Sequence, residues 1–204
     1  MKTLVKAGGE KGEETKAFFT FERKSAMVGR EKGASAVKTK KITLLSMLSA
    51  IALTIFLLEA QIPPILPVPG IKLGLANIVT VFAVFAMGPG EGILILAVRI
   101  FLGAVFAGNF STIFYSAAGG GLAIVTTILL RRILKRDQLW VAGCLGAAAH
   151  SIGQMAMAVL LTGTPGLLIY LPLMIAVSIV TGLFTGLAAQ FLLNRGKLWK
   201  TFLN

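Results

Sequence analysis

Charged residues are nearly absent from most of this chain. Between Ile42 and Leu193 only nine residues carry a charge, whereas about a quarter of the residues in a soluble domain do. They are Glu59, Lys72, Glu91, Arg99, Arg131, Arg132, Lys135, Arg136 and Asp137. A water-soluble fold of this length could not cover its surface with so few. The sequence therefore predicts an all-α polytopic membrane protein.

The net charge of +12 could suggest a nucleic-acid partner, but the basic residues gather at the two ends and in one connection. That placement is typical of orientation signals in membrane proteins, and no aromatic-interleaved basic domain is present. We therefore expect no nucleic-acid partner. The single cysteine, Cys144, excludes an internal disulfide and a multi-cysteine metal site.

Three regions follow from the hydropathy pattern. Residues 1–41 are polar and glycine-rich and are predicted to be a disordered cytoplasmic tail. Residues 42–193 form the transmembrane domain, and residues 194–204 form a short basic end. The transmembrane domain is predicted to contain six helices, Ile42–Ala60, Leu73–Met87, Gly92–Ala107, Thr112–Leu130, Leu139–Leu161 and Leu167–Leu193. The second and third are shorter than a bilayer requires, so neighbouring helices must shield them or loop residues must extend them.

Lysine and arginine placement predicts the orientation. The stretches KTKK, RRILKRD and NRGKLWK fall on one side, whereas the opposite connections GNFS and TGTPG are uncharged. Because positive charge stays on the cytoplasmic side, we expect both termini there and an even number of spans. The predicted location is the inner (cytoplasmic) membrane.

Small residues recur at every fourth position on three segments, where they would let helix backbones approach one another in lipid. They are Ser46, Ala50 and Thr54 on the first segment, Gly143, Ala147 and Ser151 on the fifth, and Thr181, Gly182, Thr185, Gly186 and Ala189 on the sixth. Packing within the bundle accounts for most of them. The stripe on the first segment could instead dock a partner protein.

The stretch PPILPVPG, at residues 63–70, separates the first two segments and cannot sustain a helix. We expect it to fold over the outer side of the bundle as a lid. Lys72 follows at the outer mouth of the second segment, with Asn77 about one and a half turns further in. Lys72 either extends to lipid headgroups or contributes to a binding site.

Arg99 lies halfway along the third segment, where an unpaired arginine costs at least about 2.5–3.5 kcal/mol to insert. It must therefore face the bundle interior and find an acceptor. Glu59 is the only acidic residue of the outer half, so it can neutralise either Arg99 or Lys72. The other cation would then be available to an anionic ligand.

His150 and Gln154 lie one turn apart on one face of the fifth segment and are predicted to line a polar pocket. Asn109, Ser111 and Tyr115 could contribute from the outer start of the fourth segment. No second histidine exists, so we expect no metal site. Asp137 is the only aspartate, and no phosphate-binding G-x-x-x-x-G-K-[ST] loop occurs, so we expect neither intrinsic catalysis nor a cofactor.

The stretches PVPGIKLGLANIVTVFAVFAMGP and RIFLGAVFAGNFSTIFYSAAGG resemble a bacterial integral-membrane family. It is called heptaprenyl diphosphate synthase component I, or the Gx transporter family, and the resemblance covers about residues 42–193. The family is similar to the S components of energy-coupling factor transporters, six-helix carriers that work with a membrane scaffold subunit and ATPases. The resemblance implies an S-component-like bundle. It also implies that Ser46, Ala50 and Thr54 correspond to the scaffold-docking face.

Three functions remain open. The first is a substrate-binding transporter component for a small anionic solute, bound by Lys72, Asn77, Arg99, Asn109, His150 and Gln154. The second is a non-catalytic subunit in polyprenyl diphosphate or quinone metabolism that holds an isoprenoid diphosphate. Polyprenyl diphosphate synthases bind magnesium through aspartate-rich motifs, and this chain has only Asp137. The third is a membrane anchor for an electron-transfer partner, which the resemblance also permits.

Overall fold

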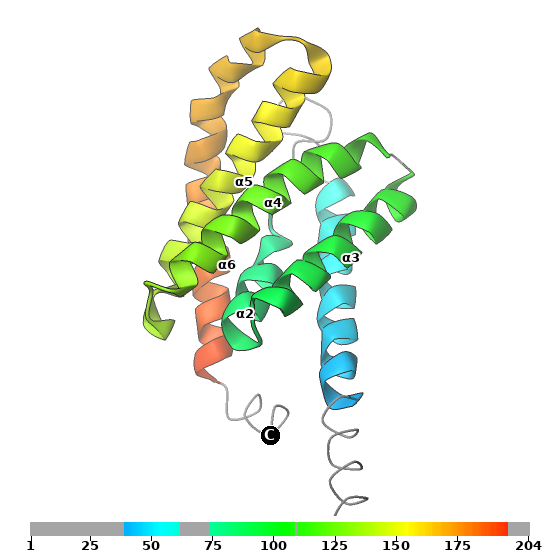
Figure 1. The fold of residues 1–204 in the computed structure, drawn as a ribbon. Coiled ribbons are helices and arrows are strands. Elements are labelled where there is room, and N and C mark those ends of the chain that lie inside the picture. The colour runs from blue at the N-terminus through cyan, green and yellow to red at the C-terminus, as the bar shows by residue number, and fades with distance from the viewer. Residues whose placement is uncertain (1–38, 62–73, 109, 196–204) are drawn as a thin grey trace, which may run out of the picture. The chain divides into compact units, whose positions relative to one another are not determined.

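The computed structural model describes residues 39–61, 74–108 and 110–195, except for the side chain of Arg136. Within these ranges the chain forms helices and turns and no strands. The predicted lid and nearly all of the predicted tail and basic end lie outside the described residues. The chain divides into two units, residues 1–43 with 202–204, and residues 44–201. The second unit contains nearly all the described residues and is treated by itself below (Figure 1).

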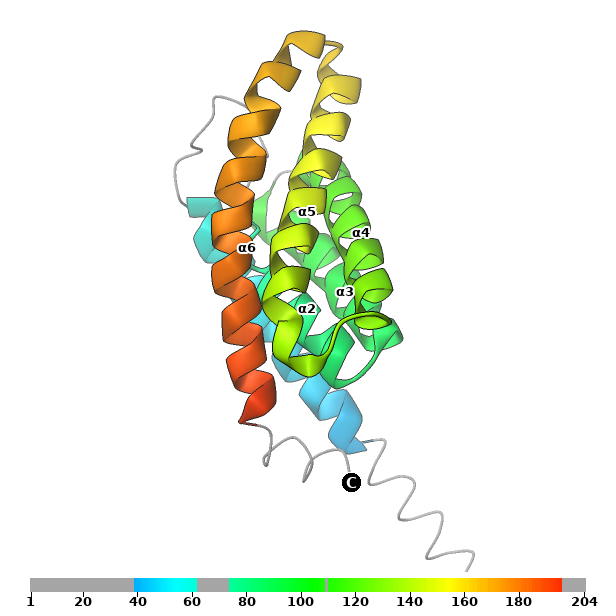
Figure 2. The same cartoon turned by 90° about the vertical axis from the view of Figure 1, so that its left-hand side faces the viewer.

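Six apolar helices form where the hydropathy pattern predicts them. They are the N-terminal helix Thr39–Gln61, α2 Asn77–Ala86, α3 Pro89–Ala107, α4 Ser111–Arg131, α5 Leu139–Thr162 and α6 Leu171–Asn194. Two short 3₁₀ turns, Arg136–Gln138 and Pro165–Tyr170, precede α5 and α6. Successive helices run in alternating directions (Figures 1 and 2). Five of the six, all but α2, are long and apolar enough to cross a bilayer, which indicates a multi-pass membrane protein.

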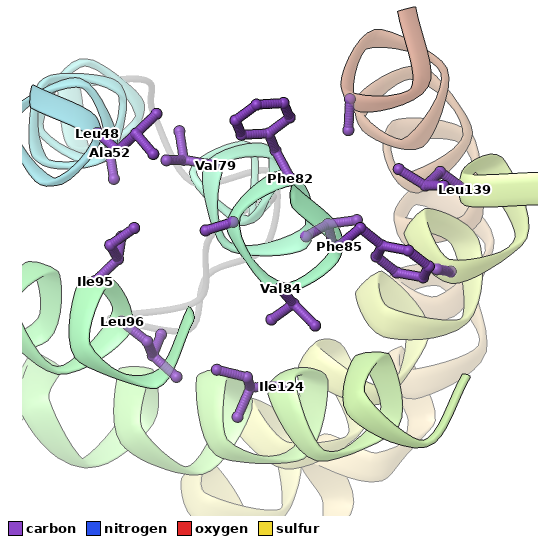
Figure 3. Close-up of a cluster of buried hydrophobic side chains, with 14 of the residues drawn as sticks. Leu48, Ala52, Val79, Phe82, Val84, Phe85, Ile95, Leu96, Ile124 and Leu139 are labelled. Carbon is purple, nitrogen blue, oxygen red and sulfur yellow. The ribbon is translucent and has the colours of Figure 1, made fainter. Parts of the chain in front are cut away.

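The short helix α2 lies at the centre of the bundle. Eight of its ten residues are buried, and it contacts α3, α4, α5 and α6. Leu48 and Ala52 of the N-terminal helix belong to the same apolar cluster as Val79, Phe82 and residues of the other helices (Figure 3). A helix of ten residues cannot span a bilayer by itself, and the backbone at its ends cannot be left exposed to lipid. The neighbouring helices therefore shield α2 from lipid, as its length requires.

One end of α2 lies deep in the bundle. Ten residues of α-helix span about 15 Å, half of the roughly 30 Å apolar core of a bilayer. Gly88, with a φ of +151°, turns the chain directly from the C-terminus of α2 into α3, which begins at Pro89. Because α3 has 19 residues, it continues well beyond the point where α2 begins. The N-terminus of α2, at Asn77, thus lies about halfway along the bundle.

Small residues bring α5 and α6 into backbone contact, as their spacing predicts. A Cβ atom added to Gly143 would lie 2.6 Å from the Cα of Gly186, and one added to Gly182 would lie 2.5 Å from the Gly143 carbonyl oxygen. A buried hydrogen bond between the hydroxyls of Ser151 and Ser178 joins the same two helices. In lipid, such close approach replaces the hydrophobic effect as the source of helix association.

The N-terminal helix packs against the bundle with a face other than its stripe of small residues. Leu44, Leu48, Ala52 and Phe56, spaced four residues apart, are buried. The stripe of Ser46, Ala50 and Thr54 is exposed. These three residues therefore do not serve as packing contacts among the described helices, in contrast to the stripes on α5 and α6.

Gly143→Ala should destabilise the protein, because the added methyl group meets backbone atoms of α6 that cannot move alone. We expect a loss of about 1–3 kcal/mol, seen as a lower melting temperature of the detergent-solubilised protein. Gly121→Ala is the matched control, since a Cβ there meets nothing within 4 Å. It should melt at or slightly above the wild-type temperature. Equal melting of the two variants would contradict the contact.

Candidate functional site

Arg99 lies in the bundle interior, as its position in an apolar helix predicts. It is the eleventh of the 19 residues of α3, and its side chain is only 2 % exposed. Its Nη1 donates a hydrogen bond of 3.2 Å to the Oδ1 of Asn77. The carboxylate of Glu59 also attracts it electrostatically. A neutral amide at the start of α2 and a charge on the N-terminal helix thus stabilise the guanidinium together.

Two residues of α5 face the same interior. His150 is 4 % exposed and Gln154 is 1 % exposed, one turn apart on one face of the helix. Gly74, just before α2, lies beside both elements, since a Cβ there would be 3.2 Å from the Nδ2 of Asn77 and 3.4 Å from the Cδ2 of His150. α2, α3 and α5 therefore place their polar side chains in one buried cluster.

The glycines of α4 make room for this cluster. A Cβ on Gly119 would lie 2.7 Å from the Cγ of Gln154 and 3.1 Å from the Cε1 of His150. A Cβ on Gly120 would lie 2.8 Å from a methyl group of Leu96 and 3.6 Å from the Nη2 of Arg99. A larger residue at Gly119 would displace the side chain of Gln154, and one at Gly120 would displace that of Leu96 beside Arg99. Gly119 and Gly120 are therefore close helix contacts that adjoin the polar residues, whereas a Cβ on the next glycine, Gly121, would meet nothing within 4 Å.

Several buried polar atoms of the cluster have no hydrogen-bond partner in the described part of the chain. They are the Nδ2 of Asn77, the Nε of Arg99, the Nδ1 of His150 and the Oε1 of Gln154, together with the Oγ1 of Thr80 one turn below Asn77. Buried polar atoms are normally paired, and each unpaired one costs about 1–3 kcal/mol. Their concentration on three facing helices indicates a place where a polar ligand or ordered water completes the bonding.

We define the interior polar cluster as Asn77, Arg99, His150 and Gln154. All four were expected to line a site, and the structure brings them together. Lys72 and Asn109 lie outside the described residues, so their roles stay predictions. Ser111 is exposed and Tyr115 packs against Ala158 in a separate apolar contact, so neither joins the cluster.

Two contributions were not expected from the sequence. Thr80 faces the interior because it lies three residues after Asn77 on the same helix face, a spacing that could have identified it. The backbone N–H of Gly74 donates a hydrogen bond to the Oε1 of Glu59. No sequence pattern predicts that bond, since it joins two segments through their three-dimensional arrangement.

Asn77→Leu should destabilise the protein because it leaves a buried N–H of a charged group without its acceptor. We expect a loss of about 1–3 kcal/mol, measured as a lower melting temperature in detergent. Thr54→Val is the control, since Thr54 is exposed and its hydroxyl bonds only to Ala50 of its own helix. Wild-type melting of Asn77→Leu would show that Arg99 does not depend on this amide.

Comparison with known proteins supports the resemblance seen in the sequence. The profile of the family described as heptaprenyl diphosphate synthase component I matches residues 48–192, which is more than half of the chain and includes all four residues of the interior polar cluster. No curated protein and no solved structure matches the chain. The chain belongs to the heptaprenyl diphosphate synthase component I family.

Proposed function

We propose that this chain is the solute-binding membrane component of a transport system for a small anionic solute, which binds at the interior polar cluster. The observation that carries the proposal is Arg99, a guanidinium 2 % exposed at mid-bundle whose Nε has no hydrogen-bond partner among the described residues. A guanidinium offers five N–H donors in a planar fork that fits carboxylate and phosphate oxygens. Ionisable groups at this depth mark ligand or ion paths in most membrane proteins.

The other members of the cluster complete such a site. Asn77 offers an unpaired amide nitrogen, His150 an unpaired ring nitrogen, and Gln154 an unpaired amide oxygen. Ligand sites of this kind have mostly apolar walls and a few convergent polar groups. The buried residues Ile95 and Leu96, which lie within one turn of Arg99 on α3, are apolar. The chemistry these groups offer is selective binding and release, with no bond made or broken.

The transport proposal also includes the membrane, the orientation of the chain and a partner subunit. We propose an S-component-like bundle of six helices in the inner membrane, with both termini in the cytoplasm, as the basic residues predict. A membrane scaffold subunit with ATPases would dock on Ser46, Ala50 and Thr54. Support comes from the exposure of this stripe, which leaves the small residues open to another helix.

The family match favours a second candidate function. The family's description names a component of heptaprenyl diphosphate synthase, so the chain could be a non-catalytic membrane subunit that associates with other synthase components. In that case an isoprenoid diphosphate would be held by the bundle, with Arg99 on the diphosphate. The two functions differ in what the purified protein carries: a small solute in the first and a long polyprenyl chain in the second.

Native mass spectrometry of the gently purified protein tests the proposal. Wild type should carry a small anionic molecule, visible as a mass shift that disappears on denaturation. Arg99→Met, which removes the cation and keeps an apolar side chain, should insert into the membrane but carry at least tenfold less of it.

Arg131→Met is the matched control, because it makes the same charge change at the C-terminal end of α4 and should retain the molecule. Equal retention in Arg99→Met and wild type would contradict the proposal. A polyprenyl diphosphate as the bound species would favour the second function.

A further inference from the structure

An acidic residue of one helix lies at the N-terminus of another. Glu59, near the end of the N-terminal helix, is 5 % exposed, and its Oε1 accepts a hydrogen bond from the backbone N–H of Gly74. Gly74 has a φ of +79°, which suits glycine, and the chain turns there into α2. The carboxylate of Glu59 is therefore held at the point where α2 begins, inside the bundle.

The start of α2 is electrostatically suited to an anion. The N-terminus of a helix carries the positive end of the helix dipole. The N–H groups of Asn77 and Ile78 bond to the carbonyls of Gly74 and Leu75, and the N–H of Gly74, just before them, binds Glu59. At α2 the residue in the capping position is Ala76, and no side chain of the helix itself caps this end. Glu59 provides the negative charge from a different helix.

Two further polar side chains, those of Asn77 and Arg99, lie near the start of α2. The Nδ2 of Asn77, which is 6 % exposed, has no hydrogen-bond partner and lies 3.2 Å from where a Cβ of Gly74 would be. Arg99 bonds Asn77 through Nη1, retains an unpaired Nε and is attracted by Glu59. The N–H of Gly74 thus binds the carboxylate, while an amide beside Gly74 and a guanidinium bonded to that amide lie close by. Each of these three also suits a free anion.

We propose that Glu59 is a tethered anion that holds, in the solute-free protein, the place taken by the carboxylate of the solute. The inference rests on the proposed function and names its solute class, a small carboxylic acid. The solute binds by exchange: its carboxylate replaces that of Glu59 at Gly74 and Arg99, and no covalent bond changes. The displaced Glu59 takes up a proton as the solute carboxylate binds, so Arg99 stays beside one negative charge at every stage and no uncompensated charge is left in the bundle.

Chemical rescue of Glu59→Ala tests the exchange in the full-length protein. Removing the carboxylate should lower the melting temperature in detergent. Formate and acetate should then raise it in a concentration-dependent way and recover more than half of the loss. Wild type should respond far less, because there a free carboxylate must first displace the tethered one. Neutral acetamide should have no effect on the variant, since it carries no charge. Inorganic phosphate should raise the melting temperature less than formate or acetate, since it is bulkier than the planar carboxylate that was removed.

Two controls separate this site from general effects of the acids. Glu91→Ala removes the acidic residue in the first turn of α3 and should show no rescue. The double variant Glu59→Ala with Arg99→Met should also show none, because the guanidinium is gone. If Glu59→Ala is recovered folded only when formate or acetate is present during purification, that dependence counts as rescue.

Absence of rescue in Glu59→Ala, with recovery independent of the acids, would overturn the exchange. The proposed function is tested separately, by whether Arg99→Met carries less of the bound anion than wild type does. Rescue by phosphate alone would overturn the assignment to carboxylic acids. Equal rescue of the double variant would show that the acids act elsewhere.

Discussion

The burial of Arg99 is the constraint on which the rest of this bundle depends. A guanidinium in the middle of an apolar helix costs at least about 2.5–3.5 kcal/mol to insert unless the protein solvates it. Here the solvation comes from the amide of Asn77 and from the charge of Glu59. The amide comes from the first residue of α2, a helix that begins at the depth of Arg99. The half-length of α2 and the position of Arg99 in α3 are therefore two parts of one arrangement.

That arrangement also explains why the central helix is the shortest. A full-length helix in the place of α2 would fill the interior with its own side chains and satisfy its own backbone. Because α2 begins only at Asn77, its N-terminus, the turn at Gly74 and a group of polar side chains lie inside the bundle. Non-helical backbone at membrane depth is tolerated only where protein or water surrounds it. Gly119 and Gly120 of α4 provide the space for these groups.

The sequence predicted the helices and many of the interior residues, because hydropathy and helical spacing are local signals. It placed Arg99 inside on insertion cost alone, and His150 and Gln154 on one helix face. It could not say that Asn77 would be the acceptor for Arg99, because that choice depends on how α2 packs against α3. Small-residue spacing was equally ambiguous: Gly143 meets α6, whereas Ala50, in a similar pattern, is exposed.

The most direct test of the interior binding site uses His150, the only histidine of the chain. Protein labelled with ¹⁵N-histidine gives the signal of a single imidazole, from its two ring nitrogens, which reports on the cluster without mutation. The anionic small-molecule fraction of a cell extract should shift this signal in wild type, and the neutral fraction should not. Arg99→Met should abolish the shift. An imidazole signal that the anionic fraction does not shift, or that it shifts equally in Arg99→Met, would contradict the account.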